Sequence, residues 1–513
     1  MSKPRILLAG VALFVTLICW SLSSPINSHQ DEKFHLASIW CADGFDENCE
    51  YQGLSETGVD TVLIDANLCT PANAEETENK RLLIHRDLDD CKFEATKNEP
   101  LTKLTTSPDF FYETNTQIAA WIQPGHTPTV YYKTLNIFDI DNKEQSVIRF
   151  RIFNSLLFIL LLIAFLLVSD QIIRDSALFG LLATFIPHGL FLVSGVTNSS
   201  WSYAGCSLSW GFLYALLNQP FRINWKTGLT TLGWVISSGI VIFSRYDATV
   251  LLFFSNLTVL ALYFHTRTTH RKTFLLVFSI ASLITARLVW QSLPKIQSLA
   301  QAPNTPPLNL RDLLINFGTA IKLVFATLLR ILGLQAPGWG PLSASLVVFW
   351  FNLLFFVATI TLLLSAVKKI KSILLFLNLI VLLGIFLVQI SIRPDWTTPF
   401  YLIRTSWSGD VFSPRYFIPY FPFLFGILAV TSKNFTAVLS NLNFRNSLFT
   451  VLAFTQTITL HDIGRTFREN PDWYWQNLNI GVQSVFVIGT ISFTAFLYFL
   501  LIPSSNMQQI EAL

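Results

Sequence analysis

The sequence predicts a mainly α-helical, polytopic integral membrane protein with about twelve transmembrane helices. Of its 513 residues, 52% are hydrophobic and only 13% are charged, whereas soluble domains carry about 25% charged residues. Apolar stretches recur along the chain, many of them close to the ~20 residues that cross a bilayer as a helix. Basic residues gather in alternate connections between these stretches, as in polytopic membrane proteins. The net charge of +3 does not indicate nucleic-acid binding.

The first apolar stretch, Ile6 to Trp20, predicts the first transmembrane helix. Lys3 and Arg5 precede it, which places the N-terminus in the cytoplasm by the positive-inside rule. The small residues that follow, from Ser21 to Pro25, also resemble the end of a cleaved signal peptide. We expect a retained helix within residues 1–24, because an even number of helices then leaves both termini in the cytoplasm.

Residues 25–146 are polar and hold most of the acidic residues of the chain. They predict a small extracytoplasmic domain between the first and second helices. Within it, Asp60 to Asp65 and Thr129 to Tyr132 have the composition of short strands. The insert is therefore expected to mix helical and strand segments, unlike the rest of the chain.

Cysteine usage indicates an oxidising compartment for this insert. Four of the six cysteines fall in it, namely Cys41, Cys49, Cys69 and Cys91. Clustered cysteines in an extracytoplasmic segment predict two disulfides. Cys41–Cys49 with Cys69–Cys91 is the local pairing, and two other pairings remain open. The other two cysteines lie in apolar stretches and are expected to be small core residues.

Further apolar stretches predict the remaining helices within residues 147–513. They lie near 151–168, 176–195, 203–217, 228–243, 248–264, 273–290, 343–366, 373–391, 416–432, 447–460 and 480–502. The segment 309–334 mixes charged and apolar residues and predicts an amphipathic helix on the outer surface, with a re-entrant segment as the alternative.

The loop charges test this topology independently. The basic residues of the predicted cytoplasmic loops are Arg174, Arg222, Lys226, Arg267, Arg271, Lys272, Lys368, Lys369, Lys371, Lys433 and Arg445. Only Asp170 and Asp175 oppose them there, whereas the loops with mixed charge fall outside. This asymmetry predicts a multi-pass protein of the cytoplasmic (inner) membrane with both termini in the cytoplasm.

The segment from Ser28 to Trp40 is the strongest candidate for chemistry, because it places carboxylates and imidazoles where the chain leaves the membrane. If the segment is helical, Asp31 and His35 share a face. A carboxylate beside an imidazole can take part in proton transfer. The alternative is structural, since Ser28 and Asp31 have the spacing of a capping box that only begins a helix.

Other outer loops bring polar side chains to the same level of the membrane. They are His126, Asn198, Trp201, Arg245, Asp247, Arg393, Arg404, Arg415, His461 and Asp462. An enzyme acting on a lipid-linked donor needs a base for the acceptor hydroxyl and cations for the leaving phosphate. Solvated loop charges without a function are the alternative. Within the membrane, His188 is either a functional residue or a hydrogen-bonded packing residue.

Five short segments, taken in order, carry a family resemblance. They are Asp31–His35, Thr127–Tyr132, Gly195–Trp201, the Pro-rich turn after Leu332, and Pro414–Pro419. They resemble, respectively, an Asp-Glu followed by His, Tyr-Pro-Pro-x-Tyr-Tyr, a segment ending in Asn-Pro-Ser-Gly, a Gly-Trp segment, and Gly-Arg-Tyr-x-x-Pro. These motifs are similar to those of the predicted bacterial membrane proteins catalogued as domain of unknown function 2142 (DUF2142).

That family is grouped with the GT-C type glycosyltransferases, whose donors are polyprenyl-phosphate sugars. The resemblance implies a GT-C-like fold and transfer of a sugar to a cell-envelope glycan or protein. It implies that Asp31 is the base, that Glu32 is a second base or a metal ligand, and that His35 orients Asp31. Arg415 and Arg404 would then bind the lipid phosphate.

The resemblance implies further substrate contacts around this base. The residues concerned are Tyr416, His126, Tyr132 and Asn198. Adjacent carboxylates are compatible with Mg²⁺ or Mn²⁺ without requiring either. Two other functions remain open: a flippase or transporter of a cell-envelope lipid or polysaccharide, and a non-catalytic membrane scaffold.

Overall fold

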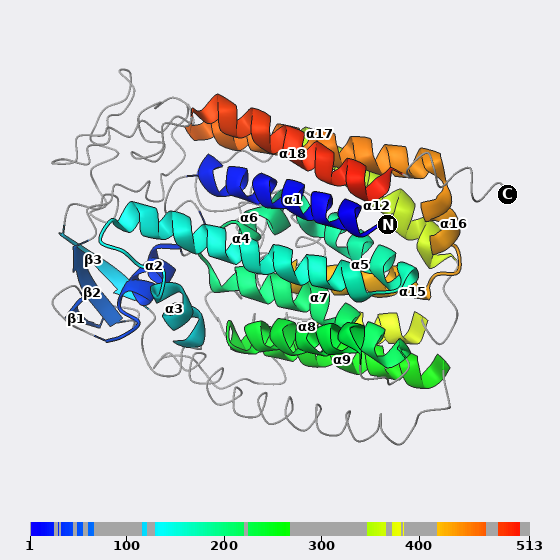
Figure 1. The fold of residues 1–513 in the computed structure, drawn as a ribbon, viewed down its shortest axis with the longest axis horizontal. Helices are drawn as coiled ribbons and strands as arrows, with labels where there is room; N and C mark the ends of the chain where they lie inside the picture. Colours follow the sequence, from blue (N-terminus) through cyan, green and yellow to red (C-terminus); the bar gives the residue numbers. More distant parts are fainter. Residues whose placement is uncertain are drawn as a thin grey trace, which may run out of the picture.

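A computed structural model of the chain shows long helices lying side by side, with a small sheet at one end (Figure 1). The structure describes residues 2–24, 29, 32–44, 49–54, 60–65, 115–120, 129–219, 224–266, 346–365, 372–380, 383, 418–467 and 481–502. The helices of the bundle are α1 (Lys3–Ser23), α4 (Lys143–Val168), α5 (Gln171–Thr184), α6 (Leu190–Val193), α7 (Asn198–Asn218), α8 (Trp225–Ile242), α9 (Tyr246–Thr266), α12 (Leu346–Leu364), α15 (Phe421–Thr431), α16 (Phe435–Ser440), α17 (Leu442–Phe467) and α18 (Val482–Leu501).

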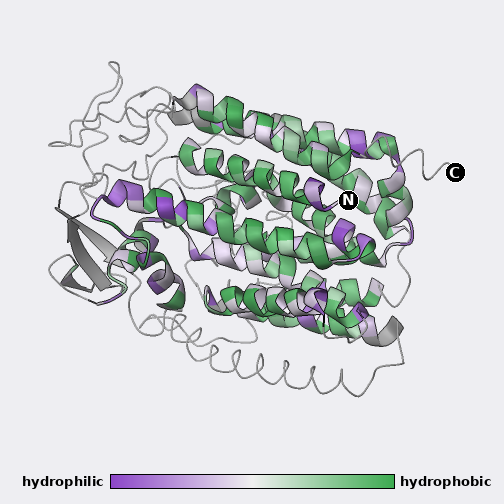
Figure 2. Cartoon of the chain, viewed as in Figure 1, coloured by the Kyte–Doolittle hydropathy of each residue, from purple (hydrophilic) through white to green (hydrophobic). Residues whose placement is uncertain are grey.

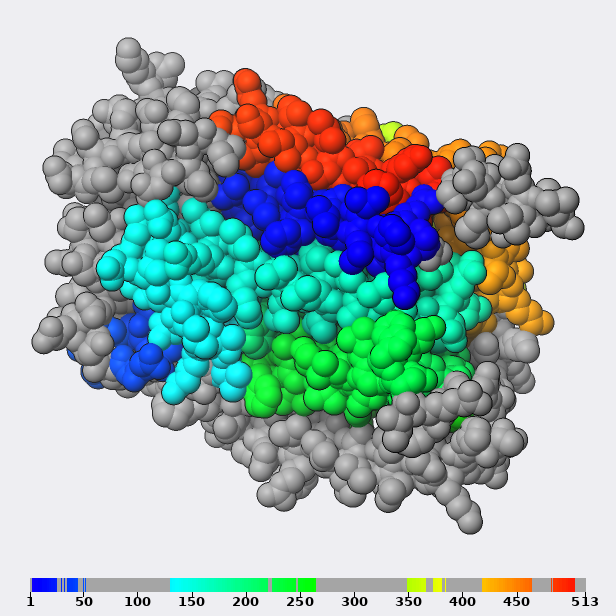
Figure 3. All heavy atoms as spheres, in the orientation of Figure 1, coloured from blue at the N-terminus to red at the C-terminus, as the bar shows by residue number. Residues whose placement is uncertain are grey.

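The first and last described helices are neighbours. α1 packs against α4 and α18, and Figure 3 shows the three together on one face of the molecule. Arg5 donates hydrogen bonds to the carbonyl oxygens of Tyr498 (3.0 Å), Phe499 (2.6 Å) and Ile502. These carbonyls lie at the end of α18, where a helix has no partners of its own for them. The start of α1 and the end of α18 therefore lie at the same end of the bundle.

α7 is the central helix, in contact with α4, α5, α8, α9 and α15. Most of its residues are buried, although five of its first twelve are serines. Small residues let transmembrane helices approach closely. At Gly205, an added Cβ would overlap the carbonyl oxygen of Ser237 in α8. α7 is thus buried through close packing around small side chains, rather than through the single apolar stripe of an ordinary surface helix.

The helical run from α5 to α6 is interrupted by a wide turn, η3 (Phe185–Gly189). Ile186 has extended backbone angles (φ −113°, ψ 126°), and the Ile186–Pro187 peptide bond is cis. His188 is buried within this turn. Farther along the chain, η7 (Ile418–Tyr420) leads into α15. The Tyr420 hydroxyl donates to the Asn378 side chain, which also bonds Thr258 in α9.

The sheet and two short helices cover one end of the bundle. β1 (Glu50–Leu54), β2 (Asp60–Asp65) and β3 (Asn115–Ala120) form an antiparallel sheet in the order β1-β2-β3. Between the bundle and the sheet lie α2 (Glu32–Trp40) and α3 (Thr129–Asn136). We call this the sheet end.

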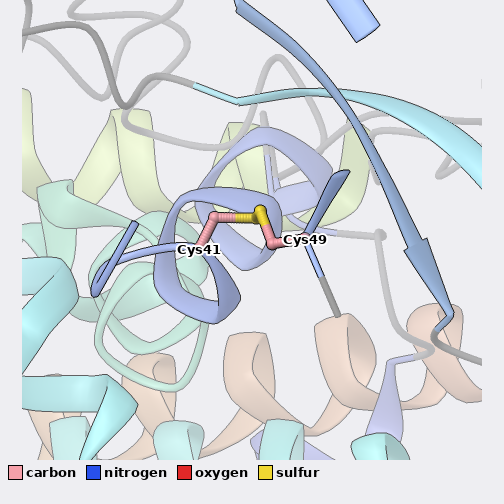
Figure 4. The surroundings of a disulfide bond; sticks show 2 residues. All are labelled: Cys41 and Cys49. Carbon is pink, nitrogen blue, oxygen red and sulfur yellow. A yellow bond between two sulfur atoms is a disulfide. The ribbon is translucent and has the colours of Figure 1, made fainter. Parts of the chain in front are cut away.

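A disulfide between Cys41 and Cys49 joins the turn after α2 to the start of β1 (Figure 4). The prediction of a disulfide at this place is confirmed, and the described Cys19 and Cys206 are buried, as expected. The predicted Cys69–Cys91 pairing lies outside the described residues. The strand predicted at 60–65 is confirmed as β2.

The strand predicted at 129–132 is wrong, because these residues begin helix α3. Tyr131, Tyr132 and Leu135 are buried, while Val130 and Lys133 are exposed. Burial at i, i+1 and i+4 is the pattern of one helix face. The β-branched and aromatic residues favoured a strand only while their packing partners were unknown.

The charges of the opposite end have one dominant sign. We call it the basic end, after Lys3, Arg5, Arg174, Lys226, Lys433 and Arg445. Among the described residues of this end, Asp170 and Asp175 carry the opposing charges. Figure 2 shows apolar residues along the helices between the two ends.

Four described helical segments are long and apolar enough to cross a membrane. They are Lys3–Ser23, Lys143–Val168, Gln171–Val193 and Gln483–Leu501, and shorter apolar helices occur at Ala248–Tyr263, Val348–Leu364 and Ile418–Thr431. The mainly helical fold with several apolar helices is confirmed. The total of about twelve spans stays a prediction, since the predicted span at 273–290 and part of the one at 373–391 lie outside the described residues. The predicted amphipathic segment 309–334 also lies outside them.

Candidate functional site

A buried ion pair lies where the sheet end meets the bundle. Glu32 is in the first turn of α2, and Arg151 is in α4. Arg151 Nε and Nη2 both donate to Oε1 of Glu32 (3.0 and 2.9 Å), and Nη2 also donates to Oε2 (2.8 Å). Both side chains are fully buried. Such forked contacts between guanidinium and carboxylate are strong and directional.

The same arginine, Arg151, also donates hydrogen bonds at the C-terminal end of α1. Arg151 Nη1 donates to the carbonyl oxygens of Ser21 (2.6 Å) and Ser24 (2.8 Å). Carbonyls at a helix C-terminus lack helical partners, and a positive charge there is favourable. Oε1 of Glu32 in turn accepts from the backbone N–H of Val196 (3.2 Å). The ion pair therefore ties α1, α2, α4 and the loop before α7 together.

An aromatic and polar cluster extends from this pair. His35 Nδ1 lies 3.1 Å from the Tyr132 hydroxyl, and the two rings are stacked. The neighbouring Tyr131 meets His35 edge-on and also meets Trp201, with 5.0 Å between the last two ring centroids. Burial raises the pKa of the Tyr131 hydroxyl well above its ordinary value. Tyr131 is therefore neutral at physiological pH.

Asn154 connects this cluster to the loop before α7. Its Oδ1 accepts from Trp201 Nε1 (3.0 Å), and its Nδ2 donates to the carbonyl oxygen of Gly195 (2.9 Å). Arg245, at the start of α9, donates from Nη1 to the Ser199 hydroxyl (2.8 Å). The segment that precedes and begins α7 is thus held from α4, α2 and α9.

His29 is a second buried imidazole at this end. Its Nε2 lies 3.3 Å from the Ser24 hydroxyl, and its ring stacks on Phe191 at 3.8 Å between centroids. An added Cβ at Gly195 would overlap the ring, so only glycine permits this contact. Burial, followed by the positive charge of Arg151, lowers the pKa of His29 well below 6.5. His29 is therefore neutral at pH 7.

The structure brings together three of the residues that the sequence predicted for the site: Glu32, His35 and Tyr132. A fourth, Asn198, begins α7 and is buried next to the loop that Glu32 holds. The other predicted site residues, Asp31, His126, Arg404, Arg415 and Tyr416, lie outside the described residues.

Sequence reasoning did not assign Arg151, Asn154 or Tyr131 to the site, and it gave His29, one of the imidazoles of the segment from Ser28 to Trp40, no specific role. Arg151 stands at the first position of the apolar stretch 151–168. An arginine inside a predicted span needs a partner, and the sequence offers two carboxylates, Asp31 and Glu32, just after the first helix. That signal would have indicated the Glu32–Arg151 pair.

The described residues of this end do not form a metal-binding site. Among the described residues, no group of three His, Cys, Asp or Glu side chains could hold a metal ion. Both carboxylate oxygens of Glu32 are bonded to Arg151. A cation at Glu32 would have to displace a buried guanidinium.

Fold and site together define an integral membrane protein that carries a buried, hydrogen-bonded polar cluster at one end of its helices. A sequence model of the family described as "Predicted membrane protein (DUF2142)" matches residues 13–424. The chain belongs to this family, as the five motifs predicted. No curated protein and no solved structure matches the chain.

Proposed function

We propose that this membrane protein transfers a sugar from a polyprenyl-phosphate donor to a glycan or protein acceptor of the cell envelope. The observation that supports the proposal most is the clamp on the first turn of α2. The Glu32–Arg151 pair and the His35–Tyr132 contact fix the helix that directly follows Asp31 in the chain. A general base needs such rigid support to meet its substrate in one geometry.

In this mechanism Asp31 takes the proton of an acceptor hydroxyl while the acceptor oxygen bonds to the anomeric carbon of the sugar. The bond from that carbon to the phosphate oxygen breaks, and polyprenyl phosphate leaves with the electron pair. Arg415 and Arg404 neutralise the negative charge of the leaving phosphate. His126 and Tyr416 complete the donor and acceptor contacts.

The described geometry changes the role that we assign to Glu32. Both of its oxygens accept hydrogen bonds from Arg151, which supports a role for Glu32 in positioning α2 rather than as a base or a metal ligand. His35 is bonded to Tyr132, so it supports the same helix from α3. Asn198, at the start of α7, belongs to the loop that the ion pair holds. The mechanism proposed here needs no metal step.

The proposal includes an orientation in the cytoplasmic membrane. The Cys41–Cys49 disulfide supports an oxidising compartment for the sheet end. The excess of lysine and arginine at the basic end supports a cytoplasmic location for the start of α1 and the end of α18. The candidate site would then face the side of the membrane where lipid-linked sugars meet envelope acceptors.

A transporter of a lipid or polysaccharide is the second candidate. Interrupted helices mark the binding sites of many transporters, and η3 interrupts the run from α5 to α6 beside α17. On α17, Gln456 is fully buried, and neither atom of its amide has a partner among the described residues. The hydroxyl of Ser207 on α7 is likewise unpartnered among them.

The two candidates are separated with the purified full-length protein in vesicles. Radiolabelled polyprenyl-phosphate sugars and an envelope extract report transfer, and a fluorescent polyprenyl phosphate reports movement across the bilayer. We expect transfer by the wild type and a loss of roughly 10²–10⁴-fold in rate for Asp31→Asn. Lipid movement without transfer, unchanged in Asp31→Asn, would favour the transporter instead.

Asp141→Asn is the matched control, because Asp141 is an exposed carboxylate at the same end of the molecule. It should leave transfer unchanged. Glu32→Gln is unsuitable as a test of catalysis, since it weakens a buried ion pair and acts on folding. Equal transfer rates for Asp31→Asn and Asp141→Asn would remove Asp31 from the reaction.

A further inference from the structure

The basic end carries a compact group of one indole and two ammonium groups. Lys3, at the start of α1, places its Nζ 5.5 Å from the ring centroid of Trp225. Lys226, at the start of α8, places its Nζ 6.0 Å from the same centroid. All three side chains are exposed. We call this group the Lys–Trp–Lys cluster.

Two features fix the members of this cluster in place. Asn224 caps α8 by accepting from the backbone N–H of Thr227 (2.9 Å), so the first turn that carries Trp225 and Lys226 is well formed. The start of α1 is held by Arg5, two residues after Lys3, through its bonds to the end of α18. The backbone at both lysines is therefore held in place, because each lysine lies at the start of an anchored helix.

The surroundings increase the positive potential. The guanidinium of Arg5 lies over the Tyr498 ring, 6.0 Å from its centroid, and within electrostatic range of Arg445. Arg174 Nε lies 3.5 Å from Oδ1 of the adjacent Asp175. The other basic residues of this end therefore still outnumber its acidic residues. Like charges held near each other at one surface favour a bound anion.

We propose that the Lys–Trp–Lys cluster binds the headgroup phosphate of an anionic phospholipid such as phosphatidylglycerol. The cluster lies where α1, a helix long and apolar enough to cross a membrane, begins. Trp225 is 55% exposed, and tryptophan at the end of a membrane helix lies at headgroup level. The two ammonium groups flank its ring and supply the charge that an anionic headgroup requires.

A lipid fits this place better than a free phosphate ion. An exposed indole gains from contact with the glycerol and acyl region of a lipid, whereas a soluble anion would leave the ring in water. A zwitterionic lipid such as phosphatidylcholine satisfies the indole but not the pair of ammonium groups. The cluster therefore selects a lipid with net negative charge.

Native mass spectrometry of the full-length protein in detergent measures this selection directly. Titration with dioleoyl phosphatidylglycerol and dioleoyl phosphatidylcholine should show tighter binding of the anionic lipid. A basic residue near a membrane surface contributes about 1 kcal/mol to anionic lipid binding, which is about a five-fold change in affinity. Lys3→Gln with Lys226→Gln should therefore lower the affinity for phosphatidylglycerol by roughly 30-fold.

Two matched variants control the experiment. Lys133→Gln with Arg149→Gln removes the same charge from exposed positions at the sheet end and should change little. Lys3→Arg with Lys226→Arg keeps the charge and should keep the selection. The thermal unfolding temperature in neutral detergent checks that each variant is folded.

An unchanged lipid preference in Lys3→Gln with Lys226→Gln would overturn the proposal, as would an equal loss in the sheet-end control. Displacement of phosphatidylglycerol by inorganic phosphate would also overturn it, because the cluster would then be a site for free anions. The outcome is independent of glycosyl transfer, since binding is measured without donor or acceptor.

Discussion

Arg151 donates hydrogen bonds to three residues at the candidate site, Glu32, Ser21 and Ser24. One guanidinium neutralises Glu32 and satisfies the carbonyl oxygens of Ser21 and Ser24 at the end of α1. A buried ion pair is not stabilising by itself, because the cost of removing two charges from water offsets their attraction. We expect the pair to contribute to specificity instead, because an arrangement of α1, α2 and α4 that separates Glu32 from Arg151 would leave a buried charge without its counter-ion.

Replacing Arg151 should therefore be far more damaging than replacing the pair. Arg151→Met leaves the carboxylate of Glu32 buried without its cation and should lower the free energy of unfolding by about 3–5 kcal/mol. Glu32→Leu combined with Arg151→Met removes both charges and should recover part of that loss. Unfolding in mixed detergent micelles gives both values. Additive losses in the double variant would contradict the coupling between the two side chains.

His29 gives the sheet end a dependence on pH. Its pKa in the folded protein lies well below 6.5, because of burial and the charge of Arg151. In the unfolded chain the imidazole has its ordinary pKa, so below pH 6.5 the unfolded state binds more protons than the folded state. Stability is then lost as pH falls from 6.5 toward the folded pKa, with a slope of at most roughly 1.4 kcal/mol per pH unit.

The variant His29→Gln isolates this contribution. It keeps a polar side chain near Ser24 but cannot titrate. As the pH falls below 6.5, we expect the free energy of unfolding of the variant to fall less steeply than that of the wild type. The other histidines titrate in both proteins, so the difference between the two curves reports His29. Parallel curves would show that His29 is not held neutral in the folded protein.

At the scale of elements, the sequence predicted the helices, strands and cross-links that depend on a short local pattern of residues. The helices of the bundle follow apolar stretches, and β2 follows a short run of β-branched and apolar residues, which pairs with β1 and β3. The Cys41–Cys49 bond follows from cysteine spacing in an insert that was expected to be extracytoplasmic. Each of these features is encoded within a short stretch of chain.

Features that depend on distant partners were not predictable in this way. Tyr131 and Tyr132 read as strand residues, yet contacts with His35 and Trp201 place them on a buried helix face. The partner of Glu32 is 119 positions away in α4. Patterns in a single sequence do not show which distant residues form a pair, so Arg151 and Asn154 in α4 and the role of Tyr131 in α3 emerged only from the structure.

At the scale of the whole molecule, the two ends differ in chemistry. The sheet end has a disulfide, the buried polar cluster and charges of both signs, while the basic end has an excess of lysine and arginine. The positive-inside rule counts charges along the sequence. The fold adds that the charges of α1, α5, α8 and α17 meet at one end in space, beside the last turn of α18.

This difference predicts which end faces the cytoplasm. Ile137, just after α3, and Ser440, the last residue of α16, are exposed positions at the sheet end and the basic end, respectively. Both can be changed to cysteine without altering charge. In spheroplasts, a membrane-impermeant maleimide should label Ile137→Cys at once, and Ser440→Cys only after lysis. The unmodified chain gives the background from its own cysteines. The reverse pattern would place the disulfide-bonded sheet end in the reducing cytoplasm, where such bonds are rare. It would also separate the candidate site from every envelope acceptor and so contradict the proposed reaction.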